Sequence, residues 1–198
     1  MLILISSAIR RITAAILVTL AGAAPLSADT ETDLALQAQE IVKQFAGQLK
    51  PQLQQAMREG GPPLAVKVCA ETAPLIADSL SESTGWSVRR VSDRPRNPKA
   101  AMDDWETRAF RTLETRLEQG NGEALITYET TQKGFRYVQA QVTEGLCLSC
   151  HGAVLDANTA AALELHYPND QAKGYQLGEI RGLFSLQKSL TSPADHAD

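Results

Sequence analysis

Residues 124–151 read ALITYETTQKGFRYVQAQVTEGLCLSCH. Apolar and polar residues alternate over 124–130 and again over 135–142, which predicts two strands. The short connection Gln132-Lys133-Gly134 between them predicts an antiparallel hairpin. The segment Cys147-Leu148-Ser149-Cys150-His151 follows directly. The cysteine pair and its adjacent histidine are therefore expected in the segment that follows the hairpin.

Residues 147–151 match C-x-x-C-H, the sequence at which haem c is attached. In that chemistry both thiols become thioethers, and the histidine can supply an axial nitrogen to the iron. A zinc site normally needs a second cysteine pair, and the chain has three cysteines in all. A thioredoxin-like dithiol should lie within a βαβ unit, which the flanking residues do not show. We therefore predict one covalent haem c on Cys147 and Cys150, with His151 as a metal ligand.

The first 28 residues resemble a secretory signal peptide. Arg10 and Arg11 precede an apolar stretch, 12–24, that is short for a bilayer span. Cleavage after Ala28 would leave residues 29–198, about 170 residues, which suits a single domain with its own core. A retained N-terminal anchor is the alternative. Because haem c is attached outside the bacterial cytoplasm, we expect a periplasmic protein without a membrane span in the mature chain.

Cys69 remains once the pair at 147 and 150 is assigned. A lone thiol in an oxidising compartment has three explanations. It can be buried as a small apolar group, it can form an intermolecular disulfide, or it can bind the haem iron as a thiolate. The helical pattern around Leu64 and Val68 places Cys69 on the inward face, which fits both the first and the third explanation.

The N-terminal part of the predicted domain is helical. Apolar residues recur every three or four positions over 30–60 and over 64–83, which predicts two helices. Gly60-Gly61-Pro62-Pro63 separates them. Pro51 is expected to kink or divide the first helix, and Pro74 to interrupt the second.

The remainder mixes strands and helices. In chain order we predict a strand at 86–92, a loop at 93–101, a helix from Asp103 or Asp104 to Glu118, the hairpin, a short helix at 158–166, a strand at 180–186 and a loose tail from 192. This order indicates an α+β fold with an antiparallel sheet.

The chain resembles exported c-type haem domains with a PAS-like fold, which occur alone and at the sensor end of bacterial signalling proteins. The likeness spans about residues 33–190. It rests on these segments: Val68-Cys69, Ala73-Pro74, Val88-Arg89-Arg90-Val91-Ser92, Arg96-Asn97-Pro98, Trp105-Glu106, Cys147-Leu148-Ser149-Cys150-His151-Gly152, Tyr167-Pro168-Asn169-Asp170, Ala172, Gly174-Tyr175, Gly178 and Arg181-Gly182. The resemblance implies a PAS-like antiparallel sheet flanked by helices, with a long N-terminal helical segment. It also implies that Cys69 is the second axial ligand, opposite His151.

Other residues compete for the iron and for the haem carboxylates. His166, Met57, Met102 and His196 are alternative ligands, although each position is more typical of a surface, core or tail residue. Arginine binds carboxylates bidentately, so Arg89, Arg90, Arg96 and Arg181 are candidates for the propionates. The resemblance favours Arg96 with Asn97, and Ser92 is expected to support the same loop.

Three functions are compatible with such a haem. The PAS-like resemblance favours a redox or small-ligand sensor that acts on a signalling protein. The alternative is a one-electron carrier with a redox partner. A haem enzyme needs an open iron site, so two protein ligands argue against catalysis. The formal net charge of −4 argues against a nucleic-acid partner.

Overall fold

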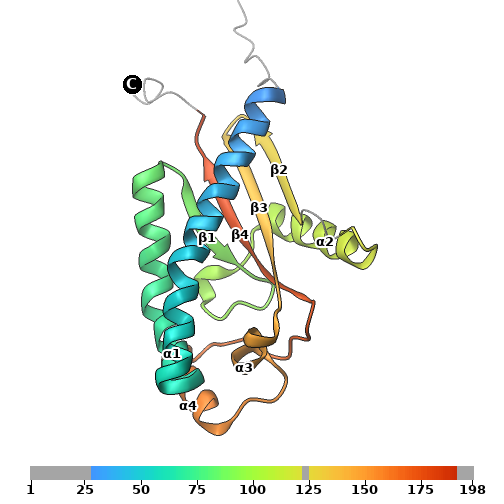
Figure 1. The fold of residues 1–198 in the computed structure, drawn as a ribbon. Coiled ribbons are helices and arrows are strands. Elements are labelled where there is room, and N and C mark those ends of the chain that lie inside the picture. Colours follow the sequence, from blue (N-terminus) through green and yellow to red (C-terminus); the bar gives the residue numbers. More distant parts are fainter. Residues whose placement is uncertain (1–27, 122–124, 191–198) are drawn as a thin grey trace, which may run out of the picture.

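A computed structural model describes residues 28–121 and 125–190, so the predicted signal peptide up to residue 27 and the tail from 191 lie outside the described ranges. Strands β1 (Ser87–Val91), β2 (Ile126–Thr131), β3 (Gly134–Val142) and β4 (Ile180–Lys188) form one antiparallel sheet. The strand order is β1-β4-β3-β2, and helices flank the sheet (Figure 1). The predicted α+β fold class is confirmed.

Helix α1 (Ala28–Thr84) consists of two arms that fold back on each other (Figure 1). Gly61 separates them with φ 66° and ψ −161°, a backbone conformation that a residue with a Cβ rarely adopts. We call residues 28–60 the first arm and residues 62–84 the second arm. The break predicted at Gly60–Pro63 is therefore confirmed.

The predicted division of the helices at the two internal prolines is wrong. Pro51 and Pro74 lie inside the arms, and Gly61 is the residue of α1 whose backbone angles leave the helical region. Each proline removes the hydrogen bond to the carbonyl four residues earlier, at Gly47 and Ala70. Both prolines are exposed, so water can reach the carbonyls that lose their donors. The helix continues through both positions.

Both arms of α1 pack on the same face of the sheet. Ile41 and Phe45 of the first arm join Ile76 and Leu80 of the second in one buried cluster. Phe45 packs edge-on against Phe184 of β4, with ring centroids 5.2 Å apart. The cluster fixes the second arm beside β1.

Helix α2 (Asp104–Glu118) covers the opposite face of the sheet. Asp103 caps it in a capping box. The Glu106 backbone nitrogen donates to the Asp103 side chain, and the Asp103 backbone nitrogen donates to the Glu106 side chain. Phe110 and Leu113 pack against the sheet through residues such as Leu183. The cap predicted at Asp103 or Asp104 is thus Asp103.

Short elements join the strands. They are η1 (Pro98–Ala100), η2 (Gly145–Cys147), α3 (Leu148–His151) and α4 (Ala157–His166). Strands β2 and β3 pair through the tight turn at Gln132 and Lys133, as the hairpin prediction expected. No helix within residues 28–121 and 125–190 is long and apolar enough to cross a bilayer.

Candidate functional site

The C-x-x-C-H residues form a short helical segment just beyond β3. The turns η2 and α3 follow each other directly, and the backbone nitrogen of Gly152 closes the segment on the carbonyl of Leu148 at 2.9 Å. A Cβ at Gly152 would lie 2.6 Å from that carbonyl oxygen, so a larger residue would displace the turn. The sequence therefore holds both cysteines and the histidine close together.

Both thiols of this segment are half-buried and free. Burial raises the pKa of Cys150 to about 11, although the nearby Arg96 acts in the opposite direction. The Cys150 thiol therefore stays protonated near neutral pH and is a weak nucleophile by itself.

The His151 ring is oriented by one backbone carbonyl. Its Nδ1 lies 2.9 Å from the carbonyl oxygen of Ala172, which can only accept a hydrogen bond. Nδ1 must therefore carry the proton, and Nε2 keeps its lone pair for a metal. Burial, together with the positive charges of Arg96 and Arg181, lowers the pKa of His151 to about 2, so the ring is neutral.

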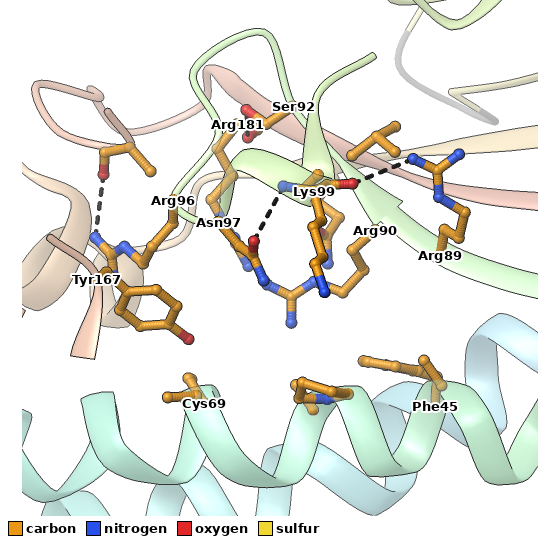
Figure 2. A pocket seen from close by; sticks show the side chains of 18 of the residues that line it. Phe45, Cys69, Arg89, Arg90, Ser92, Arg96, Asn97, Lys99, Tyr167 and Arg181 are labelled. Carbon is orange, nitrogen blue, oxygen red and sulfur yellow. Dashed lines mark hydrogen bonds between the residues drawn. The ribbon is translucent and has the colours of Figure 1, made fainter. Parts of the chain in front are cut away.

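A cavity of about 420 Å³ lies between α1 and the β1 side of the sheet. Its size falls in the range of small-molecule sites. Figure 2 shows Cys69 on α1 facing the side chains that come from β1 and the loop after it. His151 lines the same cavity, as do Phe45 and Tyr167. The structure thus brings Cys69 and His151 to one space, and the inward orientation predicted for Cys69 is confirmed.

The cavity wall is strongly basic. Asp78 is the acidic side chain among the described lining residues, whereas six of the lining side chains are basic: Arg89, Arg90, Arg94, Arg96, Lys99 and Arg181. Three of these arginines lie near carboxylates elsewhere. Arg89 approaches Glu106 at 3.9 Å, Arg94 approaches Glu179 at 3.7 Å, and Arg96 contacts Asp170 at 3.1 Å.

Arg90 and Arg181 differ from those three. Neither forms an ion pair within the described part of the chain. The Arg181 Nε is buried without a hydrogen-bond partner, and burial with the nearby charge of Arg181 lowers the pKa of Arg90 to about 10. Half-buried cations without counter-charges are unfavourable, so these two side chains mark where an anionic group would bind.

Arg96, the arginine favoured by sequence for a propionate, is committed to protein groups. Its Nε donates to Asp170 Oδ1 at 3.1 Å, and its Nη2 donates to the carbonyls of Cys150 and Ala172. Its contacts join the cysteine motif to the segment 167–178. Binding of a cofactor carboxylate by Arg96 stays a prediction, and the cations of the described wall that form no ion pair are Arg90, Lys99 and Arg181.

Ser92 and Asn97 line the cavity and shape the loop that carries Arg96. The Ser92 hydroxyl donates to the carbonyl of Arg181 at 2.9 Å and accepts from the backbone nitrogen of Arg94 at 3.1 Å. The Asn97 side chain accepts from the backbone nitrogen of Lys99 at 3.0 Å and caps η1. Ser92 thus supports the loop, as expected.

Three of the four competing ligands do not line this cavity. His166 ends α4, Met57 lies on the first arm of α1, and Met102 packs with the cluster beneath α2. None of the three lines the cavity wall within the described residues. His196 lies outside the described ranges.

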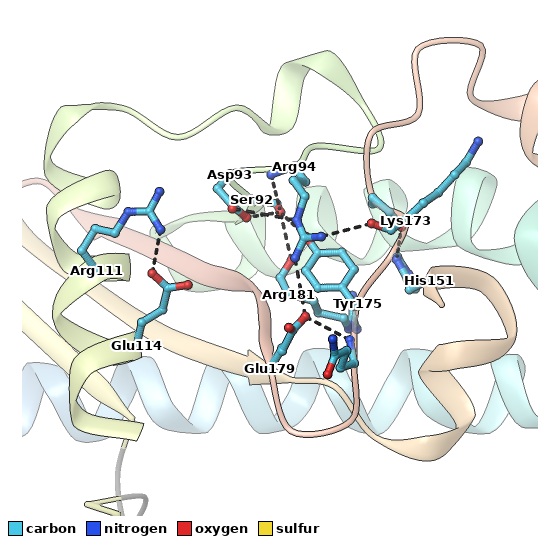
Figure 3. A network of polar contacts seen from close by, with 12 residues as sticks. Ser92, Asp93, Arg94, Arg111, Glu114, His151, Lys173, Tyr175, Glu179 and Arg181 are labelled. Carbon is cyan, nitrogen blue, oxygen red and sulfur yellow. Dashed lines mark hydrogen bonds and ion pairs between the residues drawn. The ribbon is translucent and has the colours of Figure 1, made fainter. Parts of the chain in front are cut away.

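The segment 167–178 supplies contacts to which the sequence assigned no role. Ala172 holds the His151 ring, and the buried Tyr175 packs edge-on to it at 6.1 Å between centroids. Figure 3 shows Arg94 over Tyr175, with its guanidinium carbon 3.6 Å from the ring centroid. Asp170 and Tyr175 belong to the segments that carry the sequence resemblance. Their place in that resemblance is the signal that could have identified them as site residues.

Fold and site together define an α+β domain that carries a C-x-x-C-H turn beside a basic cavity. The Tll0287-like family model, described as Tll0287, matches residues 23–189. The chain belongs to this family, which confirms the resemblance found in the sequence.

One solved structure shows the same fold. The crystal structure of the cyanobacterial heme-protein Tll0287 matches with a TM-score of 0.60 and 23% sequence identity, over 84% of this chain and 99% of that one. The search of curated proteins found no significant match.

Proposed function

We propose that this protein binds one haem covalently and is an exported redox or small-ligand sensor. Cys147 and Cys150 would form the thioethers, and His151 and Cys69 would be the axial ligands. The observation that carries the proposal is the shared cavity of Cys69 and His151, together with a His151 Nε2 left free by the Ala172 contact. Family membership, and a structural relative described as a heme-protein, support haem binding.

The remaining cavity residues fit the group. A haem carries two propionates, and Arg90 and Arg181 are two cavity cations without carboxylate partners among the described residues. Phe45 and Ala73 add apolar surface to the same wall. The residues present therefore match both the charged edge and the apolar body of a porphyrin.

Haem would supply an iron that gains and loses one electron and binds small ligands when a coordination position opens. The protein would determine which position opens. His151 is anchored by Ala172, whereas Cys69 sits on α1 without a disulfide. A thiolate ligand favours ferric iron and is more easily protonated and released after reduction, so Cys69 is the ligand expected to respond to redox state. With both axial positions filled by the protein, we expect no catalysis.

A one-electron carrier is the alternative. Leu146 and Val154 flank the cysteine motif and are 40% and 91% exposed. Exposed apolar side chains beside a redox centre favour the docking of a partner protein. Sensor and carrier differ in ligation: a sensor loses a ligand or binds a gas on reduction, whereas a carrier keeps the same ligands.

The test is expression of the full chain in a host that attaches haem c. Mass spectrometry of the purified protein should show one haem added, and the double change Cys147→Ser with Cys150→Ser should abolish the addition. Unmodified wild-type protein would refute the proposal. Absorption and EPR spectra of the ferric and ferrous forms, with and without CO, then decide between sensor and carrier.

A further inference from the structure

The peptide of Ala172 is held from both sides. Its nitrogen donates to Asp170 Oδ1 at 2.9 Å. Its carbonyl oxygen accepts from Arg96 Nη2 at 3.2 Å and lies 2.9 Å from His151 Nδ1. The acceptor that orients His151 is therefore itself fixed by two charged side chains.

Arg96 and Asp170 form one unit. Arg96 Nε lies 3.1 Å from the same Asp170 Oδ1 that accepts from Ala172, and the two side chains are 12% and 2% exposed. Arg96 Nη2 also donates to the carbonyl of Cys150, the residue before His151. The Arg96–Asp170 ion pair is therefore bonded both to the backbone next to His151 and to the Ala172 peptide that His151 contacts.

We propose that Arg96 and Asp170 are positioning residues for His151. They fix the direction of the His151 ring and the strength of its Nδ1 hydrogen bond, and they thereby set the reduction potential of the iron that His151 would bind. The inference rests on the proposed haem function and assigns to Arg96 a task other than binding a propionate.

The physical argument concerns the electron density on the ring. A strong hydrogen bond from Nδ1 makes the imidazole a better donor through Nε2, and partners beyond the ligands usually tune a metal site in this way. Better donation stabilises ferric iron and lowers the potential. If Ala172 is released, the hydrogen bond weakens and the potential rises. Arg96→Lys keeps the charges of the pair, so its effect reports geometry, whereas Asp170→Asn also removes a negative charge that Lys173 approaches at 3.8 Å.

Two conservative changes test the pair in the haem-loaded full chain. Arg96→Lys keeps the positive charge but cannot bond Asp170, Cys150 and Ala172 together. Asp170→Asn keeps the shape and an acceptor oxygen but removes the charge. Both variants should carry as much covalent haem as the wild type, with a raised midpoint potential and shifted low-spin EPR g values.

Matched controls use the same chemical changes away from the pair. Arg111→Lys alters an exposed arginine of α2 that pairs with Glu114 at 2.8 Å and is not among the described cavity-lining residues. Asp156→Asn alters the exposed cap of α4, where asparagine also caps well. Both controls should keep the wild-type potential and spectrum.

Three results would overturn the inference. The first is a wild-type potential and spectrum in both test variants. The second is an equal shift in Arg111→Lys, which would mean that the shift does not report the contacts of Arg96 and Asp170. The third is loss of haem attachment from both folded variants, which would assign the pair to maturation instead.

A measurement without haem separates this inference from the proposed function. Nitrogen-15 NMR of the haem-free full chain should show His151 as the Nδ1-protonated tautomer in the wild type and as a mixture in the two test variants. A wild type that never acquires haem would refute the proposed function alone. Unchanged tautomers in the variants would refute the positioning role.

Discussion

Cys69 and His151 line one cavity although they lie far apart in the chain. A substitution of Cys69 therefore tests the proposed ligand pair directly. We expect Cys69→Ala to keep covalent haem, because the proposed thioether residues are Cys147 and Cys150. Its ferric absorption and EPR spectra should change, and the midpoint potential should rise because a strong electron donor is lost. Ala70→Ser, at the adjacent position of the same wall, is the control and should change neither. An unchanged spectrum and midpoint in Cys69→Ala would exclude Cys69 as a ligand.

The effect of an Arg90 substitution on protein stability, measured with and without haem, tests whether Arg90 binds a haem propionate. A half-buried cation without a counter-charge is unfavourable, so Arg90→Met should stabilise the haem-free protein by up to about 1 kcal/mol. In the haem-loaded protein the same change would remove the proposed propionate partner and should destabilise. Urea denaturation of both forms gives the two signs. Arg111→Met alters an exposed arginine paired with Glu114 and should shift either form by less than about 0.5 kcal/mol. Equal signs for Arg90→Met in the two forms would argue against the propionate contact.

At the scale of elements, the capping box of α2 gives a pH-dependent prediction. Burial raises the pKa of Asp103, but hydrogen bonds from the Glu106 backbone and from Arg136 outweigh it and hold the pKa below its usual 3.8. A lowered pKa in the folded state stabilises the protein above that range, and the contribution is lost as the pH falls through the folded pKa.

Asp103→Ala should therefore destabilise the protein by about 1 kcal/mol near neutral pH, as expected for loss of a helix cap. The difference from wild type should shrink at acidic pH, once the pH falls below the lowered pKa of Asp103 and the carboxyl becomes protonated. Chemical denaturation at the two pH values measures this. Asp104→Ala, which changes the next residue outside the box, should cost less at neutral pH, and a constant difference between the pH values would contradict the capping role.

The two arms of α1 meet at Gly61, and this turn gives a second prediction for an element. With φ 66°, Gly61 is in a region that alanine disfavours, so Gly61→Ala should destabilise by about 1 kcal/mol. Gly47 lies inside the first arm with open space around its Cβ position. Gly47→Ala should stabilise by about 0.5 kcal/mol because alanine is the better helix former. Thermal melts compare the two, and similar effects of both changes would contradict a special conformation at Gly61.

At the scale of the whole molecule, features that depend on sequence neighbours could be predicted from the sequence, whereas contacts between distant segments could not. The hairpin, the α2 cap and the break at Gly61 depend on neighbours in sequence, so the sequence predicted them. The partner of Arg96 is Asp170, 74 residues away, and only the packed fold brings it there. Strand alternation predicts that Arg89 and Arg90 face opposite sides of the sheet, but it does not predict that both line one cavity.

The cavity lies between α1 and the sheet, so release of Cys69 from the iron should change the stability of the whole second arm. If the protein is a sensor, reduction should speed amide hydrogen exchange over 62–84, because release of Cys69 loosens that arm from the cavity wall. The β2–β3 hairpin lies at the far edge of the sheet and should exchange equally in both states. Cys69→Ala should remove the redox dependence while leaving the hairpin unchanged. Equal exchange over 62–84 in the ferric and ferrous wild type would instead favour the electron carrier, because a carrier needs the same shape in both oxidation states.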